Sequence, residues 1–199
     1  MASVPDSTER PVGRIIVVRH GSTEWSRSGR HTGRTDVPLD SAGRSAAAGL
    51  SGRLAELGIV AAWSSPLCRA RESAALAGFA EARLADDLME WDYGDYEGRT
   101  TAEIREERPD WALFRDGCPG GETLVEVEAR CTEMIGRVPL DPEAEGAAAL
   151  FAHGHLLRVL AATYLDLGGA AGAHFMLDTA TVGILGFERT TRALRGWNA

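Results

Sequence analysis

Cysteine is scarce in this chain of 199 residues. The three cysteines, Cys68, Cys118 and Cys131, are an odd number, and no two of them form a C-x-x-C pair. A disulfide framework and a zinc knuckle both need paired cysteines, so the sequence argues against either. Cysteine usage of this kind favours a reducing compartment.

Long hydrophobic runs and an excess of positive charge are also missing. No apolar stretch reaches the roughly 20 residues of a membrane span, and residues 1–14 lack the apolar core of a signal peptide. The net charge of −8 argues against nucleic acid or an anionic membrane as a partner. We therefore expect a cytoplasmic protein, in which local arginines would have to capture any anionic substrate.

Several familiar phosphate-binding and hydrolase motifs are absent as well. The sequence contains no P-loop, no G-x-S-x-G elbow and no complete G-x-G-x-x-G fingerprint. Cys131 and Arg137 have the spacing of a cysteine-dependent phosphatase loop. However, residues 132–136 fall late on a predicted amphipathic helix, where the backbone amides are already bonded, and Glu133 would repel an anion. Cys131 is therefore not the predicted nucleophile.

Apolar runs and helical periodicities alternate along the rest of the chain. The pattern predicts an α/β fold, a three-layer sandwich with a mostly parallel central sheet, helices on both faces and a lid-like insertion near 91–120. Residues 1–13 are polar with two prolines and are predicted to be a disordered tail, which leaves 14–199 as a single domain. The predicted strands are 14–21, 59–65, a weaker 82–90, 147–155, and a closing pair at 179–188 and 191–198.

Polar side chains follow four of these strands. They are Arg19-His20, Arg69 (just after Ser65-Pro66, the predicted start of a helix), Glu90 and His153. The carboxyl ends of parallel strands form the usual active-site edge of such sheets. Arginine forks bind phosphate oxygens, a neutral histidine can be a covalent nucleophile, and a carboxylic acid can protonate a departing alkoxide. This set favours phosphoryl transfer to a histidine nitrogen.

The segment R-H-G-S-T-E-W (19–25) resembles the signature of the histidine phosphatase superfamily, the phosphoglycerate mutase-like proteins. Later blocks match in order: H-T-G-R-T-D-V-P-L, S-S-P-L-C-R, M-E-W-D-Y-G-D-Y-E-G and A-H-G-H. With the R-D-G-C-P-G-G-E-T block at 115–123, the chain is most similar to the branch with sedoheptulose-bisphosphatase and an actinobacterial acid phosphatase.

The resemblance implies roles for individual residues. His20 would be phosphorylated, Glu90 would be the proton donor, and Arg19, Arg69 and His153 would complete the phosphate pocket. Secondary phosphate contacts would come from Ser26, where many relatives have Asn, from Thr32, and from the amides of Gly33 and Gly154. Tyr93 is the expected substrate contact of the insertion, while His155 either touches the leaving group or lines the mouth. His31 and His174 are expected to be surface or structural residues.

No metal or other cofactor is expected, because the arginines would repel a divalent cation and the A-H-G-H block contains no carboxylate. The predicted function is a metal-independent phosphatase acting on a small phosphorylated metabolite, a sugar phosphate or bisphosphate, through a phosphohistidine. The alternatives are a phosphoglycerate mutase-type phosphotransferase, for which residues 91–120 lack an adjacent basic pair, and a non-catalytic phosphate-binding protein. The oligomeric state stays open, a homodimer included.

Overall fold

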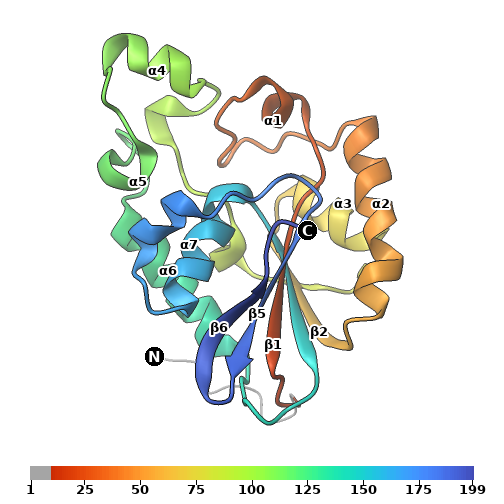
Figure 1. Ribbon diagram of the computed structural model, residues 1–199. Coiled ribbons are helices and arrows are strands. Elements are labelled where there is room, and N and C mark those ends of the chain that lie inside the picture. Colours follow the sequence, from red (N-terminus) through yellow and green to blue (C-terminus); the bar gives the residue numbers. More distant parts are fainter. Residues whose placement is uncertain (1–9) are drawn as a thin grey trace.

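The computed structural model describes residues 10–199, and a six-stranded sheet forms its centre (Figure 1). The strand order is β3-β2-β4-β1-β5-β6. β2, β3 and β4 run parallel to β1, whereas β5 is antiparallel to β1 and β6 is antiparallel to β5. The strands are β1 (Arg14–Arg19), β2 (Ile59–Ser64), β3 (Arg83–Leu84), β4 (Ala147–Ala152), β5 (Val182–Glu188) and β6 (Thr191–Gly196). The predicted mostly parallel sheet is confirmed.

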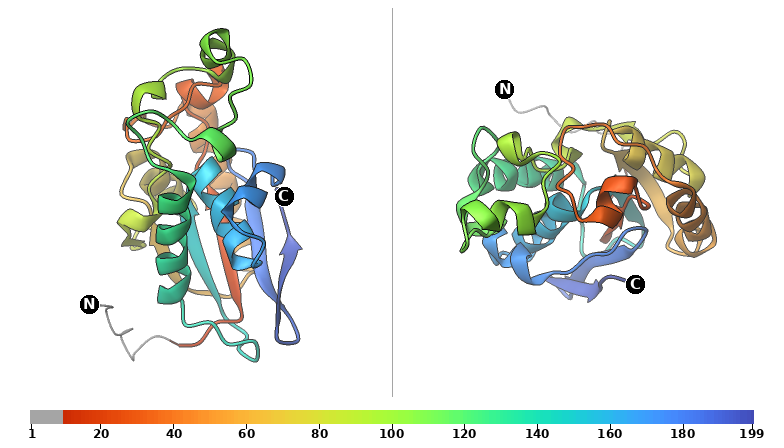
Figure 2. Two further views of the ribbon diagram at one scale, coloured as in Figure 1. Left: turned by 90° about the vertical axis from the view of Figure 1, so that its left-hand side faces the viewer. Right: turned by 90° about the horizontal axis from the view of Figure 1, so that it is seen from above.

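The helices form a layer on each face of the sheet (Figures 1 and 2). α2 (Ser41–Ala55) and α3 (Cys68–Leu76) cover one face, and α6 (Leu124–Arg137) and α7 (Gly154–Tyr164) cover the other. Alternate residues of β1 enter different cores: Ile16 packs with Leu54 of α2, and Val17 belongs to the core that includes Met134 of α6. Burial on both faces accounts for the uninterrupted apolar sequences of β1 and β4.

Short elements gather above the carboxyl ends of β1, β2 and β4. They are α1 (Glu24–Ser28), the 3₁₀ turns η1 (Asp86–Leu88) and η2 (Gly94–Tyr96), α4 (Thr101–Glu107) and α5 (Leu113–Asp116). A further 3₁₀ turn, η3 (Gly169–His174), follows α7. The predicted insertion is anchored from below, because Trp91, Ile104 and Trp111 are buried in the same core as α6 and α7. It is joined to the loop before α2 by backbone hydrogen bonds between His31 and residues 98 and 99.

Three local expectations need correction. The predicted strand 82–90 pairs only through Arg83 and Leu84, and the chain then turns as a 3₁₀ helix that buries Leu88, because aspartates such as Asp86 are poor strand residues. α3 begins at Cys68 rather than directly after Ser65-Pro66, and it has no side-chain N-cap. Residues 1–9 of the predicted tail lie outside the described residues, but Val12 of the same stretch is buried and its N–H donates to the Pro139 carbonyl at 2.9 Å.

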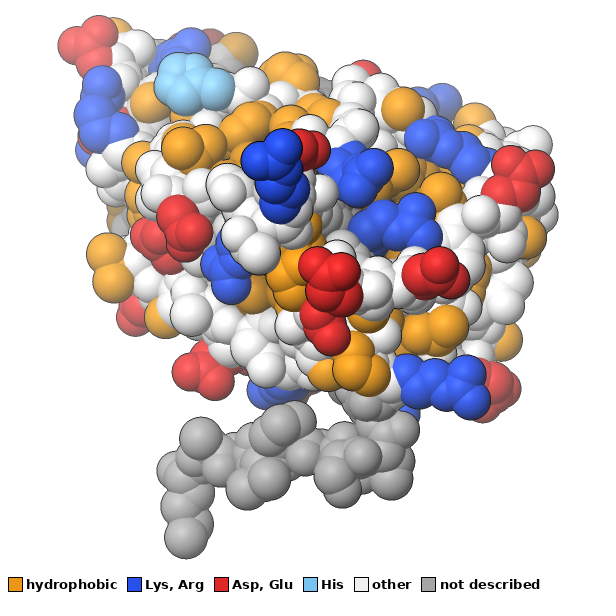
Figure 3. All heavy atoms as spheres, turned by 60° about the horizontal axis from the view of Figure 1, so that its bottom comes forward, with side chains coloured by type: hydrophobic (Ala, Val, Ile, Leu, Met, Phe, Trp, Pro, Cys, Tyr) orange, Lys and Arg blue, Asp and Glu red, His pale blue; other side chains and the backbone are white. Residues whose placement is uncertain are grey.

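The lower face of the molecule carries side chains of both charge signs. On the part of this face that the structure describes, Arg and Asp or Glu side chains are interspersed with hydrophobic ones rather than gathered into one basic surface (Figure 3). No helix within residues 10–199 is long and apolar enough to cross a membrane.

Candidate active site

A pocket of about 250 Å³ opens at the carboxyl ends of β1 and β4. The two strands are paired in register, with Arg19 opposite Ala152, so the residues that follow them emerge side by side. Of the predicted site residues, the pocket is lined by Arg19, His20, Ser26, Thr32, Glu90, Tyr93, Gly154 and His155. The structure thus brings eight of the predicted site residues together at one pocket.

His20 is held in one tautomer beside the pocket. Its Nδ1 lies 2.7 Å from the Gly21 carbonyl oxygen, an acceptor only, so Nδ1 carries the proton and Nε2 carries the lone pair. The ring is 5% exposed. Burial, together with the charges of Arg69 and Arg19, lowers the pKa of His20 well below its ordinary value of 6.5. The ring is therefore neutral at pH 7, as nucleophilic attack requires.

Arg19 has unsatisfied donors. Its Nη1 donates to the Leu177 carbonyl oxygen at 2.5 Å, whereas its buried Nε has no acceptor in the described part of the chain. The guanidinium lies against Gly154, where an added Cβ would be 3.1 Å from Arg19 Cζ. The Gly154 N–H, at the start of α7, likewise has no acceptor within residues 10–199. Donors without a protein acceptor beside a neutral histidine are suited to bind an anion.

Arg69 and His153 lie behind His20 instead of lining the pocket, which differs from the expectation. Arg69 Nε donates to His153 Nδ1 at 3.1 Å, and the other Arg69 nitrogens donate to the carbonyl oxygens of Thr32, Gly33 and Thr35. The His153 Nε2–H then donates to Ser65 Oγ at 2.8 Å. The rings of His20 and His153 are 5.1 Å apart. Arg69 is fully buried among carbonyl oxygens, and in this arrangement its charge acts on His20 through space.

Glu90 is fixed by backbone amides. Oε1 accepts from the N–H groups of Trp91 at 2.9 Å and Leu156 at 2.8 Å, and Oε2 accepts from the His155 N–H at 3.0 Å. Two of these amides belong to the first turn of α7. Oε2 has one bond fewer than Oε1, so it is the oxygen better able to exchange a proton with a molecule in the pocket.

Of the residues predicted to make secondary phosphate contacts, some line the pocket and others are hydrogen-bonded within the protein. The Gly33 N–H, expected to contact phosphate, instead donates to Glu97 Oε1 at 2.8 Å, and Gly33 does not line the pocket. The Ser26 hydroxyl is engaged with the backbone of Thr23 in the capping box of α1. Thr32 lines the pocket. Gly33 and Glu97 are 64 residues apart, so nothing local in the sequence could indicate their bond.

The structure adds residues that sequence reasoning had missed. His31 is 8% exposed and lines the pocket, so of the two expectations for it, surface or structural, the first is wrong. Burial lowers its pKa to about 4. Its ring centroid is 4.8 Å from that of Tyr93, whose hydroxyl lies 2.6 Å from His155 Nδ1. Arg158 also lines the pocket, and its position one helical turn after Gly154 is a signal that could have revealed it. The rest of the newly identified lining consists of Gly29, Arg30, Thr101 and Leu177.

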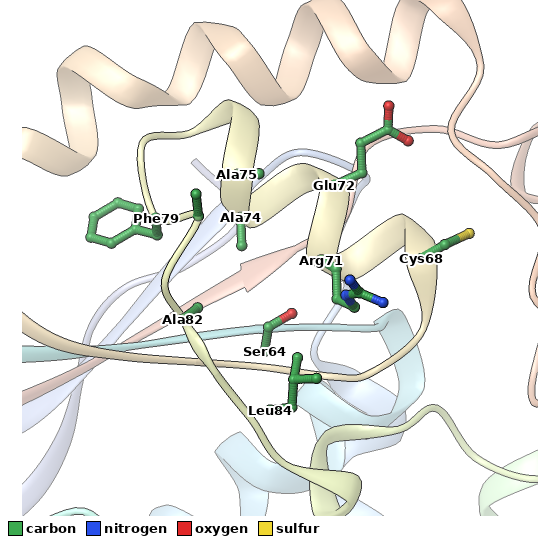
Figure 4. A pocket seen from close by; sticks show the side chains of 10 residues that line it. Ser64, Cys68, Arg71, Glu72, Ala74, Ala75, Phe79, Ala82 and Leu84 are labelled. Carbon is green, nitrogen blue, oxygen red and sulfur yellow. The ribbon is translucent and has the colours of Figure 1, made fainter.

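A second hollow, between α3 and the β2–β3 edge of the sheet, is lined by no histidine (Figure 4). It is lined by Ser64, Cys68, Arg71, Glu72 and Phe79, among others. Arg71 follows Arg69 by two residues, which on a helix is roughly 200°, so the two arginines point to opposite sides. Burial raises the pKa of the Cys68 thiol to about 11, which keeps it unreactive at neutral pH. Within residues 10–199, no group of three or more His, Cys, Asp or Glu is arranged to hold a metal ion.

Comparison with known proteins gives a consistent assignment. The family model described as the histidine phosphatase superfamily (branch 1) matches residues 15–199. An acid phosphatase of Mycobacterium tuberculosis is 39% identical over 184 residues, covering 91% of this chain and 90% of the relative. Sedoheptulose 1,7-bisphosphatase of Saccharomyces cerevisiae is 38% identical over 193 residues, covering 78% of this chain and 68% of the relative.

Solved structures agree. A Mycobacterium tuberculosis open-reading-frame product superposes with a TM-score of 0.86 at 36% identity, covering 93% of this chain and 96% of the other. A mycobacterial glucosyl-3-phosphoglycerate phosphatase in complex with VO3 superposes with a TM-score of 0.83 at 29% identity, covering 94% and 100%. The resemblance seen in the sequence motifs is thus confirmed, and the chain belongs to branch 1 of the histidine phosphatase superfamily.

Proposed function

We propose that the protein is a phosphatase that hydrolyses small phosphomonoesters through a phosphohistidine on His20, without a metal ion. The observation that carries this proposal is the His20 ring itself. Its proton is held on Nδ1 by the Gly21 carbonyl, and two arginines and burial keep the ring neutral beside the pocket. These conditions leave Nε2 free to attack phosphorus.

The residues around the pocket can carry out both steps of the reaction, the phosphorylation of His20 and the hydrolysis of the phosphohistidine. In the first step Nε2 of His20 forms a bond to phosphorus, the bond from phosphorus to the leaving oxygen breaks, and protonated Glu90 gives that oxygen its proton. In the second step water forms the new P–O bond, its proton passes to Glu90, and the P–N bond breaks. Arg19 Nε and the Gly154 amide bind phosphate oxygens, and the Arg69 charge keeps His20 neutral.

The substrate class that fits best is a sugar phosphate or sugar bisphosphate. Two of the relatives act, by their names, on phosphorylated sugars or sugar derivatives: sedoheptulose 1,7-bisphosphate and glucosyl-3-phosphoglycerate. The pocket of about 250 Å³ is small, and Arg30 and Arg158 also line it and could bind a second anionic group of the substrate. The VO3 bound to a relative supports a site for a tetrahedral or five-coordinate oxyanion.

The proposal extends to a cytoplasmic homodimer. The three cysteines are free thiols, which suits a reducing compartment. β3 pairs only with Trp63 and Ser64, which leaves the earlier part of β2 as a sheet edge, and Val60 there is 55% exposed. Such an edge can pair with the same edge of a second copy across a two-fold axis. Light scattering should give twice the chain mass for the wild type and the monomer mass for V60E.

The test of the activity is phosphate release from a panel of sugar phosphates and from p-nitrophenyl phosphate, in EDTA. We expect turnover by the wild type and none above background by H20A. C131S is the matched control, because Cys131 is fully buried in α6 and its burial raises the thiol pKa far above neutral pH. Full activity in H20A, or a folded but inactive C131S, would contradict the proposal.

A further inference from the structure

Arg130, on α6, uses every N–H donor of its guanidinium within the protein. Nε and Nη2 form a bidentate pair with Glu122, at 2.7 and 2.9 Å. Nη1 donates to the carbonyl oxygens of Asp87 at 2.9 Å and Met89 at 2.6 Å, and Nη2 donates to the Glu90 carbonyl oxygen at 3.2 Å. A guanidinium has five N–H groups, and these five bonds account for all of them.

The partner carboxylate fixes the residues on the other side of Glu90. Glu122 Oε2 accepts from the Asp92 N–H at 2.8 Å, and the Glu122 N–H donates to the Asp92 carbonyl oxygen at 2.9 Å. The Trp91 indole N–H donates to the Glu122 carbonyl oxygen at 2.8 Å. The ion pair is mostly shielded from water, with side-chain exposures of 13% for Arg130 and 18% for Glu122. Residues 87–92 are therefore held on both sides of Glu90.

The same helix contacts the turn that receives the Glu90 carboxylate. The residue after Arg130 is Cys131, whose Sγ lies 3.8 Å from the Leu156 carbonyl oxygen. The Leu156 N–H in turn donates to Glu90 Oε1. α6 thus fixes the backbone of Glu90 through Arg130 and packs on the first turn of α7, which holds the Glu90 side chain. A shift of residues 87–92 relative to α7 would displace the carboxyl group from the pocket.

We propose that Arg130 and Glu122 are positioning residues that set the reach of Glu90 as proton donor, which rests on the proposed function of Glu90. Neither side chain lines the pocket. The ion pair acts only through the location of Glu90, so its loss should affect the proton transfer and leave phosphate binding almost unchanged. Displacement of a catalytic group by about 1 Å can cost about 10² in rate.

The test replaces Arg130 by lysine, which keeps the charge but has three donors and no planar fork. For R130K we expect kcat on an alkyl phosphate to fall roughly 10- to 100-fold, with KM within about twofold. The burst rate on p-nitrophenyl phosphate should fall less than about threefold, since its leaving group barely needs the proton. R137K is the matched control, because Arg137 is on the same helix and pairs with the Asp87 side chain. It should behave as the wild type.

A double variant separates positioning from a general structural role. In an E90Q background, R130K should cause almost no additional loss on the alkyl phosphate, because the group that it positions can no longer donate a proton. E122Q tests the pair from its other side and should reproduce the leaving-group dependence of R130K. Circular dichroism and urea midpoints monitor folding.

Equal losses on both substrates, or additive losses in the double variant, would overturn the positioning role. The same holds if R130K and E122Q both fail to fold, since the pair would then be purely structural. These results differ from a failure of the proposed function itself. That failure would appear as a wild type without turnover, or as an E90Q variant with undiminished activity on the alkyl phosphate.

Discussion

Four of the five histidines are held as neutral rings, three of them buried and His155 half-buried, and this should make the fold sensitive to mild acid. Burial is the largest cause that lowers the pKa values of His20, His153 and His155 well below 6.5, and it lowers that of His31 to about 4. His174 is exposed. In the unfolded chain each histidine takes up a proton near pH 6.5. Below that pH the unfolded chain binds more protons, so the free energy of unfolding falls as the pH falls.

The size of this effect follows from proton linkage. One pH unit below 6.5, a histidine that stays neutral only in the folded state contributes a loss of about 1.4 kcal/mol. Four such histidines give about 5–6 kcal/mol between pH 7.5 and 5.5, comparable with the whole stability of many domains, about 5–15 kcal/mol. Carboxyl groups with lowered pKa, such as that of Asp40 with its ordinary value of 3.8, contribute only at lower pH.

The assay is urea unfolding at pH 7.5, 6.5 and 5.5 in phosphate-free buffer, analysed by linear extrapolation. H31F should reduce the loss of stability between pH 7.5 and 5.5 by about a quarter, because it removes one of four contributing rings. H174Q should leave the loss unchanged. A loss in the wild type below about 1 kcal/mol, or an H31F variant with the full pH dependence, would refute the assignment of neutral buried rings.

Four further outcomes are expected. E90Q should lower kcat on an alkyl phosphate by roughly 10²–10⁴ but slow the burst on p-nitrophenyl phosphate far less; equal losses would make Glu90 a binding group only. EDTA dialysis should leave activity unchanged and vanadate should inhibit; recovery of lost activity by Mg²⁺ or Zn²⁺ would count against the mechanism. G154A should lower kcat/KM about tenfold, because the new methyl displaces the Arg19 guanidinium by a few tenths of an ångström; wild-type kinetics would show that this contact is unimportant. The pKa of His20 is lowered by burial and by Arg69, so protonation of the ring should not reduce the burst rate between pH 7.5 and 6.5. R69M should raise the pKa of His20, so the burst rate should begin to fall at a higher pH than in the wild type as the solution is acidified. An unchanged pH profile of the burst rate would contradict the electrostatic role of Arg69.

The central strands could be predicted because a strand that is buried on both faces of a sheet is a continuous run of apolar residues in the sequence. β1 and β4 lie in the middle of the sheet, and their residues are apolar for that reason. β3 is at an edge and pairs through two residues, so little of its sequence is constrained by the sheet. The predicted strand from 82 to 90 is therefore a two-residue strand followed by a 3₁₀ turn.

The site was predictable where a residue directly follows a strand, and not where long-range contacts decide side-chain direction. His20 and Glu90 reach the pocket as expected. Arg69 instead donates to three backbone carbonyl oxygens more than 30 residues away in sequence, and its remaining hydrogen bond, to His153, holds that ring outside the pocket as well. The five bonds of Arg130 join α6 to residues 87–90 and to Glu122, and no local pattern indicates them.

The most direct test of a phosphohistidine mechanism is to trap the intermediate and locate the phosphate. The enzyme is mixed with a sugar phosphate, quenched within milliseconds in base, digested and mapped by mass spectrometry under alkaline conditions. We predict one phosphate on the peptide that contains His20, stable in base, lost in acid and absent from H20A. Phosphate on another residue, or an unlabelled His20 in an enzyme that turns over with a burst, would contradict the account.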